Sequence, residues 1–325
     1  MITAIVPTYK RPAIVLRCVE SLQGQTLDAF EIVLVDNATD ARLREAIENL
    51  NASARPSVRY VAEPRLGLHN ARHAGARAAT GEILVFTDDD ATFDPGWLAA
   101  YERAFREHPE MAAAGGPVRP VWEAPPPRWL LDFMDRPEMF PLLSLLDRGP
   151  RFRLDEQGLF FGVNMAIRRD MLFELGGFNP DSFGSTWLGD GETGLNRKLQ
   201  ERGLPIGYVP EAVVYHHVPP ERMTLAYCCR RQANDGACDM FARFHSGIPR
   251  APKLLQEMLG ICRRNARDWL AAVVLQGQTS PRALRVQMRA ARTRAQVAYV
   301  VRLMCDKALR HLVLKQDWLN EPEAG

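Results

Sequence analysis

The sequence predicts an α/β protein in which a mostly parallel, mixed sheet is flanked by helices and followed by a helical extension. Its 325 residues are 46% hydrophobic and 25% charged, which is enough to bury one large core or two smaller ones. Short β-branched runs alternate with helical patterns, as is typical of a parallel sheet wrapped by helices. The runs are "TAIVPTY" (3–9), "FEIVLVD" (30–36), "SVRYVAE" (57–63) and "EILVFTD" (82–88).

A helix is expected after each of these four strands. Pro12 suits the first position of a helix, Gly67 precedes the third helix, and Pro95 opens the fourth. The small residues of the third helix would let it approach the sheet closely. Residues that share one helical face in the first three segments are Val15, Cys18, Val19 and Leu22, then Leu43, Ala46, Ile47 and Leu50, then Ala71, Ala74, Gly75 and Ala78.

The pattern changes after residue 116. Residues 116–143 are rich in Pro, Trp and Phe, too irregular for a regular element and too apolar for a disordered linker, which predicts a lid or binding loop. The run "FFGVNMAIRR" (160–169) predicts a strand, and 188–203 predicts a loop entering a helix. Two short strands around 206–217 and a mostly helical tail complete the chain.

The tail is basic, because residues 221–325 hold 18 Lys or Arg and nine Asp or Glu. Ser280 and Pro281 predict a helix start, and apolar residues from Leu284 to Leu312 recur at three- or four-residue steps. Arg282, Arg285, Arg289 and Arg292 form a second stripe. Such a helix either lies on an anionic membrane or a partner, or packs on its own domain with its arginines in water. Nucleic-acid binding is not expected, since no aromatic residues interleave the basic ones.

Cysteine usage and hydropathy give an expectation for location. The six cysteines are scattered without zinc-ligand or disulfide-framework spacing, which fits a reducing cytosol. The sequence has no stretch of about 18 uninterrupted apolar residues, so no membrane-spanning helix is expected. The expected location is therefore cytoplasmic, with a peripheral position at the inner face of a membrane as a further hypothesis.

Three consecutive aspartates, Asp88, Asp89 and Asp90, end the apolar run at 82–88. In extended chain, residues i and i+2 point to the same side, so Asp88 and Asp90 would converge while Asp89 points away. Two close carboxylates raise each other's pKa unless a cation shares them, and Mg²⁺ or Mn²⁺ suits such an oxygen site. At the carboxyl edge of a parallel sheet, this ion would meet a ligand, commonly a phosphate. The alternative is that the acidic residues only end a strand and cap the next helix.

Five motifs in order resemble the inverting nucleotide-sugar glycosyltransferases of family 2, which have the GT-A fold, a Rossmann-like α/β architecture. They are "IVPTYKRP" (5–12), "VDNAT" (35–39), "GLHNARHAGARAATGEILVFTDDD" (67–90), "GVNMAIRRDMLFELGGF" (162–178) and the acidic cluster at 189–192. The resemblance covers about residues 1–220. It implies a nucleotide-binding half (1–116) and an acceptor half (117–220), with 221–325 as a basic helical extension.

The resemblance also implies a donor site. Asp36 would recognise the base, usually uracil, Asp88 would contact the ribose, and Asp90 would hold Mn²⁺ or Mg²⁺ on the diphosphate. A histidine at the end of the strand "AVVYHHV", either His216 or His217, is a further candidate metal ligand beside Asp90 and Asp88. The residues implied to bind the nucleotide are Pro7, Thr8, Tyr9, Arg11, Asp36, Asn70, Arg72, Asp88 and Asp89.

Inverting transfer needs a base that removes the acceptor hydroxyl proton while the nucleoside diphosphate departs from the opposite face of the sugar. The family often carries a glutamate–aspartate pair before a helix, and "GDGET" (189–193) departs from that pattern. Alignment on Leu195 gives Glu192 the position of the base, with Asp190 as the rival. Residues expected on the acceptor side are Gly162, Asn164 and Trp187.

The expected function is metal-dependent transfer of one sugar from a nucleotide-sugar donor to a hydroxyl acceptor in polysaccharide or surface-glycan synthesis, with UDP as the expected nucleotide. Two alternatives remain. A non-catalytic nucleotide-sugar binder would keep the metal site without the base. A phosphohydrolase of the haloacid-dehalogenase type would use the D-x-D-x-T of "VFTDDDAT", with Asp88 as nucleophile, Asp90 as acid/base and Asp190 as metal ligand. Three strand candidates before Asp88 and the lack of lysine in 158–190 count against the phosphohydrolase.

Overall fold

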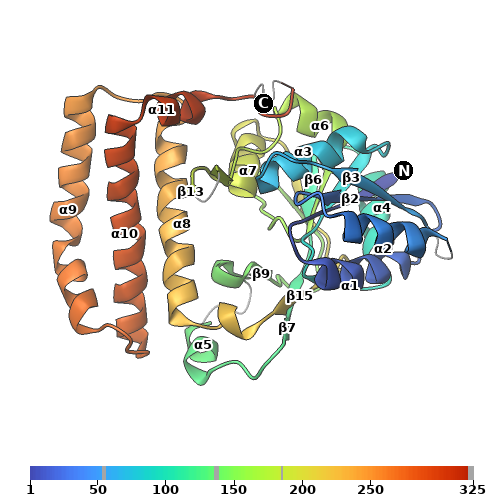
Figure 1. Cartoon of the computed structure of the whole chain (residues 1–325), viewed down its shortest axis with the longest axis horizontal. Coiled ribbons are helices and arrows are strands. Elements are labelled where there is room, and N and C mark those ends of the chain that lie inside the picture. The colour runs from blue at the N-terminus through green and yellow to red at the C-terminus, as the bar shows by residue number, and fades with distance from the viewer. Residues whose placement is uncertain (53–55, 135–138, 184–185, 321–325) are drawn as a thin grey trace.

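The computed structural model describes residues 1–52, 56–134, 139–183 and 186–320. Within these residues, eight strands form the main sheet in the order β10-β14-β6-β11-β4-β1-β2-β3 (Figure 1). Strands β1, β2, β3 and β4 run parallel, whereas β11 is antiparallel to both its neighbours. The strands are β1 (Ile2–Thr8), β2 (Phe30–Asp36), β3 (Val58–Ala62), β4 (Ile83–Phe86), β6 (Ala113–Gly115), β10 (Arg153–Asp155), β11 (Met165–Arg168) and β14 (Ile206–Tyr208). The expected mixed, mostly parallel α/β sheet is confirmed.

Helices cover both faces of the main sheet. One core lies under α1 (Pro12–Gln23), α2 (Ala41–Asn51) and α4 (Trp97–Glu107). The other lies under α3 (Leu68–Ala78), α6 (Arg169–Glu174) and α7 (Gly191–Glu201). Alternation along β1 sends Ala4 and Val6 to the first core and Ile5 to the second. Gly75 of α3 lies directly against Ile5, where a side chain would clash, so the small residues do permit close packing.

The register of the parallel strands brings the polar ends together. Thr8 pairs with Asp36 at the ends of β1 and β2, and Ile5 pairs with Phe86 at the end of β4. Residues after β1 and β4 therefore emerge at one edge of the sheet, where open α/β folds bind ligands. Lys10 adopts a left-handed backbone (φ 56°), which turns the chain so that Arg11 returns over this edge.

A second, five-stranded sheet, in the order β5-β15-β7-β9-β8, stands beside the first. Its strands are β5 (Ala91–Phe93), β7 (Val118–Trp122), β8 (Met139–Phe140), β9 (Leu145–Leu146) and β15 (Val214–Val218), with α5 (Arg128–Phe133) and the 3₁₀ turn η1 (Pro141–Leu143) in the connections. The expectation of an irregular lid at 116–143 is wrong for its described residues. Their apolar side chains are used in sheet pairing and in the first core. Residues 135–138 lie outside the described part.

The strand expected at 160–169 is shorter in the structure. Only Met165–Arg168 form β11, because Phe161 and Asn164 close a tight turn before it. A small hairpin, β12 (Ser182–Phe183) and β13 (Thr186–Trp187), then leads to α7. This hairpin and α7 stand at the same edge of the main sheet as the aspartates. Ser182 of the hairpin and the three aspartates line one cavity there.

Three long helices form the extension beside the α/β part: α8 (Leu225–Phe244), α9 (Ala251–Val274) and α10 (Pro281–Cys305), after the 3₁₀ turn η2 (Pro220–Arg222). α10 lies between α8 and α9 (Figure 1). Leu284 and Met288 of its predicted apolar stripe are buried in this packing, whereas Ala298, Val301 and Cys305 farther along the stripe are exposed. Arg292 pairs with Asp239 at 2.8 Å. Of the two interpretations of this helix, packing on its own protein is the one observed. Among the described helices, none is long and apolar enough to cross a bilayer.

The chain end ties the extension back to the α/β part. After α11 (Lys307–Leu314), the Trp318 backbone N–H donates to the Gly176 carbonyl at 2.9 Å. Arg77 of α3 donates to the Leu319 carbonyl at 2.6 Å, and the Leu319 side chain is buried in the second core. The helices are therefore anchored at both ends, at η2 and at this segment.

Candidate active site

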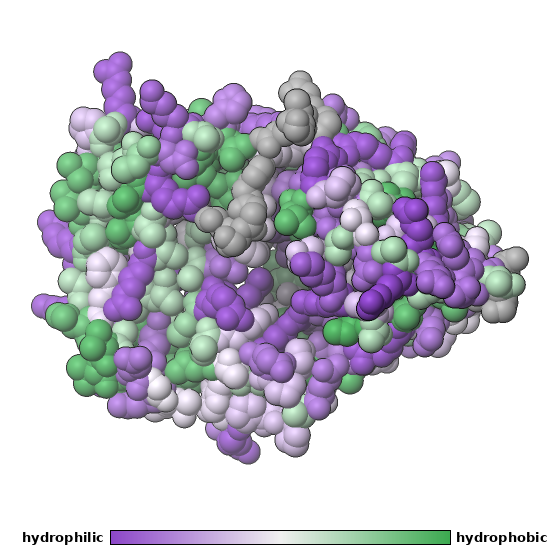
Figure 2. Space-filling model, viewed as in Figure 1, coloured by the Kyte–Doolittle hydropathy of each residue, from purple (hydrophilic) through white to green (hydrophobic). Residues whose placement is uncertain are grey.

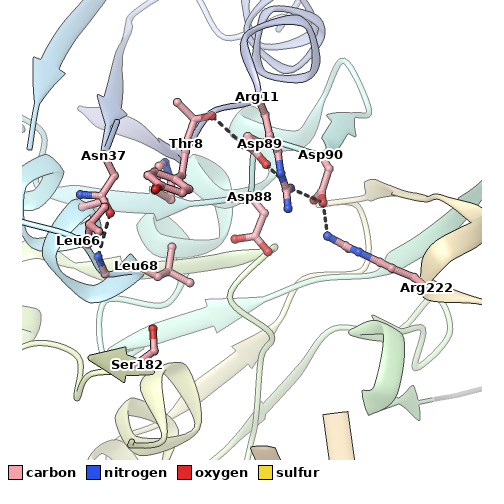
Figure 3. Close-up of a pocket in the computed structure, with 14 residues that line it drawn as sticks. Thr8, Arg11, Asn37, Leu66, Leu68, Asp88, Asp89, Asp90, Ser182 and Arg222 are labelled. Atoms are coloured by element: carbon pink, nitrogen blue, oxygen red, sulfur yellow. Dashed lines mark hydrogen bonds and ion pairs between the residues drawn. The ribbon is translucent and has the colours of Figure 1, made fainter. Parts of the chain in front are cut away.

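A cavity of about 670 Å³ opens at the carboxyl edge of the main sheet (Figure 3). Its walls come from the ends of β1 and β4, the loop before α3, the β12 strand and η2. The lining residues are Pro7, Thr8, Tyr9, Arg11, Asn37, Leu66, Gly67, Leu68, Ala71, Asp88, Asp89, Asp90, Ser182 and Arg222. Seven of the residues predicted from the sequence are among them: Pro7, Thr8, Tyr9, Arg11, Asp88, Asp89 and Asp90.

All three aspartates line this cavity, so the expectation that Asp89 points away is wrong. β4 ends at Phe86 and the chain turns at residues 89–90, so the alternation of an extended strand no longer applies. Thr8 Oγ1 donates to Asp89 Oδ2 at 2.7 Å, and Arg11 lies 3.1 Å from Asp89 Oδ1. Burial raises the pKa of Asp89 to about 6, against the opposing effects of Thr8 and Arg11.

Asp90 is held by groups from three parts of the chain. Its Oδ2 lies 3.3 Å from Arg11 and 2.5 Å from Arg222, and its Oδ1 lies 3.3 Å from His216 Nε2. Burial opposes ionisation of Asp90, but the contacts with His216, Arg222 and Arg11 outweigh burial and hold its pKa below the ordinary value. Asp90 is therefore a carboxylate at neutral pH.

The two histidines of β15 face opposite ways, as strand alternation requires. His216 is buried beside Asp90, because β15 pairs with β5 directly after the aspartates. His217 instead contacts Thr92 at 3.1 Å and Glu123 at 3.7 Å. The structure thus places His216, and not His217, at the predicted metal position.

A divalent ion fits the atoms around Asp90. Asp90 Oδ1 is buried and accepts no hydrogen bond from the described residues. His216 Nδ1 lies 3.0 Å from the Leu143 carbonyl, which can only accept, so Nδ1 carries a hydrogen. Nε2 lies 2.9 Å from Arg222, and a bound ion would replace this contact. No cluster of three His, Cys, Asp or Glu side chains within the described ranges converges on a metal position. Phosphate oxygens or water would supply the other ligands, as is usual for Mg²⁺.

Arg72 of α3 links the aspartates to the predicted base. Its side chain is buried, with its guanidinium 3.3 Å from Asp88 and 3.5 Å from Glu192. Gly162 lies directly against this guanidinium, where any side chain would collide with it. Gly162 therefore makes room for Arg72 and is not part of the cavity lining.

Glu192 and Asp190 differ in access. The Asp190 side chain is fully buried, and its two oxygens are bound by Asn179 at 2.8 Å and by Arg197. The Glu192 side chain is 23% exposed in the first turn of α7. Only Glu192 of this pair can meet a group arriving from solvent without breaking buried contacts.

Asp181 is a buried carboxyl that the sequence did not single out. Its carboxylate lies against Gly191 at the start of α7, and its Oδ2 has no hydrogen-bond partner among the described residues. Burial raises the pKa of Asp181 to about 7, the charge of Glu192 adds to this, and Arg72 opposes it. No local motif marks this residue, because its environment is built by α7 and α3.

The raised pKa of Asp181 predicts a pH-dependent stability. The folded protein keeps this proton up to about pH 7 while the unfolded chain loses it near pH 4, so the stabilising contribution present at low pH is lost across that interval. Urea unfolding at a series of pH values should show this decline, which is up to about 4 kcal/mol for a shift of this size. Asp181→Asn should flatten it. Parallel curves for the variant and the parent would contradict the assignment.

Three residues expected near the base or the diphosphate do not line the cavity: Asp36, Asn70 and the buried Arg72. Asp36 is fully buried and accepts hydrogen bonds from the backbone of Ala38 and Asp40 and from Tyr60. Asn70 donates to the Leu66 carbonyl at 3.1 Å. The next residue after Asp36 lines the cavity instead: Asn37 binds the backbone of residues 63, 65 and 67 and so shapes the loop before α3.

Two of the residues expected on the acceptor side also lie elsewhere. Asn164 is buried; its side-chain oxygen accepts from Trp97 at 2.9 Å and Tyr101 at 2.6 Å, and its nitrogen donates to two backbone carbonyls. Trp187 contacts Cys238 of α8 at 3.3 Å and packs against the helical extension. Their environments are those of packing residues.

Because Asn164 uses its whole amide, its removal should cost stability more than binding. We expect Asn164→Ala to lower the free energy of unfolding by about 3–5 kcal/mol, since Trp97 and Tyr101 are left without a buried partner. Chemical denaturation measures this. Unchanged stability would show that these groups find other partners.

Arg222 lines the cavity and contacts two predicted site residues, although the sequence analysis gave it no role. It follows β15 by four residues in a segment without a recognisable motif, yet it contacts both Asp90 and His216. The other unassigned lining residues are Asn37, Leu66, Gly67, Leu68, Ala71 and Ser182. A cation shortly after a strand that ends at the site edge is the signal that could have indicated Arg222.

Comparison with known families agrees with this site. Residues 3–176 match the model of glycosyl transferase family 2, and since this is more than half of the chain, the protein belongs to that family. Membership in this family favours sugar transfer over both alternatives, the phosphohydrolase and the non-catalytic binder.

Curated relatives match parts of the chain. The glucosyl-dolichyl phosphate glucuronosyltransferase of Haloferax volcanii is 26% identical over 164 residues, half of each chain. The succinoglycan biosynthesis protein ExoM of Rhizobium meliloti is 28% identical over 231 residues, 70% of this chain and 71% of that protein. Validoxylamine A glucosyltransferase of Streptomyces hygroscopicus subsp. jinggangensis is 25% identical over 291 residues, covering 79% and 63%.

Solved structures show the same fold. The mannosyltransferase PcManGT of Pyrobaculum calidifontis, in complex with GDP-Man and Mn²⁺, aligns with a TM-score of 0.57 at 23% identity, covering 94% of this chain and 87% of that one. GalNAc-T7 with UDP, GalNAc and Mn²⁺ aligns with a TM-score of 0.53 at 19% identity, covering 70% and 46%. The GT-A fold expected from the sequence is confirmed.

Proposed function

We propose that the protein transfers one sugar, with inversion, from a nucleotide-sugar donor bound in the 670 Å³ cavity to a hydroxyl acceptor, with Glu192 as the base. The proposal rests on the placement of Asp88, Asp89 and Asp90 beside Arg11 and Arg222 at the carboxyl edge of the main sheet. Cations and carboxylates arranged in this way suit a diphosphate and a divalent ion together.

The donor would lie across the cavity. Tyr9, Leu66 and Leu68 give the end beside the loop before α3 an apolar surface suited to a base. Arg11 and Arg222, at the aspartate end, would face the diphosphate. Asp88 would contact the ribose, as the family resemblance implies. Because Asp36 is buried with its oxygens occupied, base recognition would fall to groups in this wall, and UDP is the expected nucleotide.

Asp90 and His216 would hold Mn²⁺ or Mg²⁺ against the diphosphate. When bound, such an ion would offset the charge that gathers on the departing nucleoside diphosphate. Arg11 and Arg222 act on the same charge from this chain's own side, and Thr8 fixes the orientation of Asp89 beside them.

The acceptor would approach from the side of α7. Glu192, 3.5 Å from Arg72, would take the hydroxyl proton as the oxygen attacks the anomeric carbon and the donor phosphate leaves from the opposite face. Arg72 keeps Glu192 at a fixed position relative to Asp88. Asp190 would position the start of α7 through Asn179 and Arg197.

A glycan acceptor is supported by one relative, since the Rhizobium protein is named for succinoglycan biosynthesis. Polysaccharide or surface-glycan assembly is therefore the role proposed for the enzyme. The decisive experiment is a thermal-shift and calorimetric screen of nucleoside diphosphates and nucleotide sugars, with and without Mn²⁺. A nucleotide that stabilises the protein more strongly with Mn²⁺ than without it is expected. Nucleotide binding that ignores both Mn²⁺ and Mg²⁺ would refute the metal-dependent part.

A further inference from the structure

The outward face of α9 carries exposed large apolar side chains near both of its ends. Leu255, Leu259, Leu270, Val273 and Val274 are 45–78% exposed, and we call these residues the α9 stripe. Their spacing places them on one side of the helix. The opposite side of α9 buries Leu254, Ile261 and Ala272 in the bundle, so the stripe is additional to the packing face. Hydrophobic surface gathers over this helix at the left of Figure 2.

Cations accompany the stripe. Lys253, Arg263, Arg264 and Arg267 of α9 are all exposed. The two acidic residues of this helix point to the bundle side, where Glu257 pairs with Arg243 at 2.7 Å and Asp268 pairs with Arg289 at 3.1 Å. The outward face of α9 is therefore both apolar and positively charged.

We infer that the α9 stripe docks this enzyme on the surface of an anionic lipid bilayer, with α9 lying in the plane of the headgroups. Apolar side chains entering the headgroup region and adjacent arginines meeting lipid phosphates are the two interactions that hold amphipathic helices on anionic membranes. The helix concerned is α9 and not the sequence-predicted α10, because α9 has five exposed large apolar side chains whereas α10 has one, Val301.

A second copy of the chain fits this face less well. Antiparallel twofold packing of one helix on its copy brings the same flank of each helix together. Arg263 and Arg267 lie on one flank of the stripe, so they would face the same arginines of the copy, and like charges repel. An anionic lipid surface removes this repulsion. The inference does not depend on the donor or on the base, and its test has no catalytic readout.

The test is flotation of the full chain with vesicles of phosphatidylcholine alone or mixed with phosphatidylglycerol. We expect binding to the anionic vesicles that weakens as salt rises. Leu259→Ser combined with Leu270→Ser should lower the bound fraction at least about tenfold, because the two leucines that the bilayer would bury are lost. Leu131→Ser, at a leucine of α5 that is 44% exposed, is the matched control and should bind like the parent.

A charge variant separates the two parts of the surface. Arg263→Gln with Arg267→Gln should remove the preference for anionic vesicles and leave the melting temperature unchanged, because neither side chain has an ion-pair partner among the described residues. No binding of the parent to anionic vesicles would overturn the inference, as would an equal loss in Leu131→Ser. A dimer in analytical ultracentrifugation that Leu270→Ser abolishes, without vesicle binding, would assign the stripe to a second copy instead.

Discussion

Replacement of Asp90 by asparagine is expected to lower kcat/KM for sugar transfer about a thousandfold. Asp90 is the residue on which Arg11, Arg222 and His216 converge, and it is the proposed anchor of the divalent ion. A bound metal stabilises transition-state charge by several kcal/mol, and about 4 kcal/mol corresponds to this loss. Steady-state transfer measures the rate, and calorimetry with the nucleotide should show that Mn²⁺ no longer strengthens binding.

The matched control is Asp28→Asn, an exposed aspartate before β2 that lies outside the cavity lining. It should keep the parent's rate and the parent's response to Mn²⁺. Near-UV circular dichroism of Asp90→Asn shows whether the fold survives, since Arg11 keeps its contact with Asp89. Transfer by Asp90→Asn at the parent's rate would rule out Asp90 as the metal anchor.

Replacement of Glu192 by glutamine is expected to lower kcat by about 10²–10⁴, the range typical of losing a general base. The donor KM should change little, because the cavity lining does not include Glu192. The amide keeps the shape of the side chain, so Arg72 retains a neighbour that can accept a hydrogen bond. Single-turnover transfer separates this chemical step from product release.

Asp190→Asn distinguishes the rival base. Because Asp190 is buried and bound by Asn179 and Arg197, its variant should lose about 1–3 kcal/mol of stability through the weakened contact with Arg197. Glu201→Gln, at the exposed end of the same helix, should behave like the parent. If Asp190→Asn abolished transfer while Glu192→Gln remained active, the roles assigned to these two residues would be reversed.

The main strands and helices were predictable because hydrophobic periodicity and helix-start residues are properties of neighbouring residues. The β-branched runs at 3–9, 30–36, 57–63 and 82–88 became β1, β2, β3 and β4, and Pro12 and Gly67 mark the starts of α1 and α3 as expected. The irregular segment at 116–143 was not predictable as sheet. Its strands β7 and β8 are five and two residues long. Both pair with β9, which follows the segment, and β7 also pairs with β15, about a hundred residues away.

The family resemblance implied Pro7, Thr8, Tyr9 and Arg11 in the site, and the sequence placed Asp88 at the carboxyl edge of the sheet. The rule that parallel strands end at one edge explains why these residues share one cavity. Alternation on β15 required one inward histidine but left the choice between His216 and His217 open. That choice depends on the pairing of His216 with Ala91, a contact between segments 125 residues apart.

The sequence by itself determined the α/β class, the acidic edge and the family resemblance, because hydrophobic period and short motifs are properties of neighbouring residues. Tertiary structure decided that Arg222 reaches Asp90, that Asn164 and Asp36 are buried packing groups, and that α9 rather than α10 presents an apolar face. Burial and ion pairing depend on which distant elements pack together, and no local pattern encodes them.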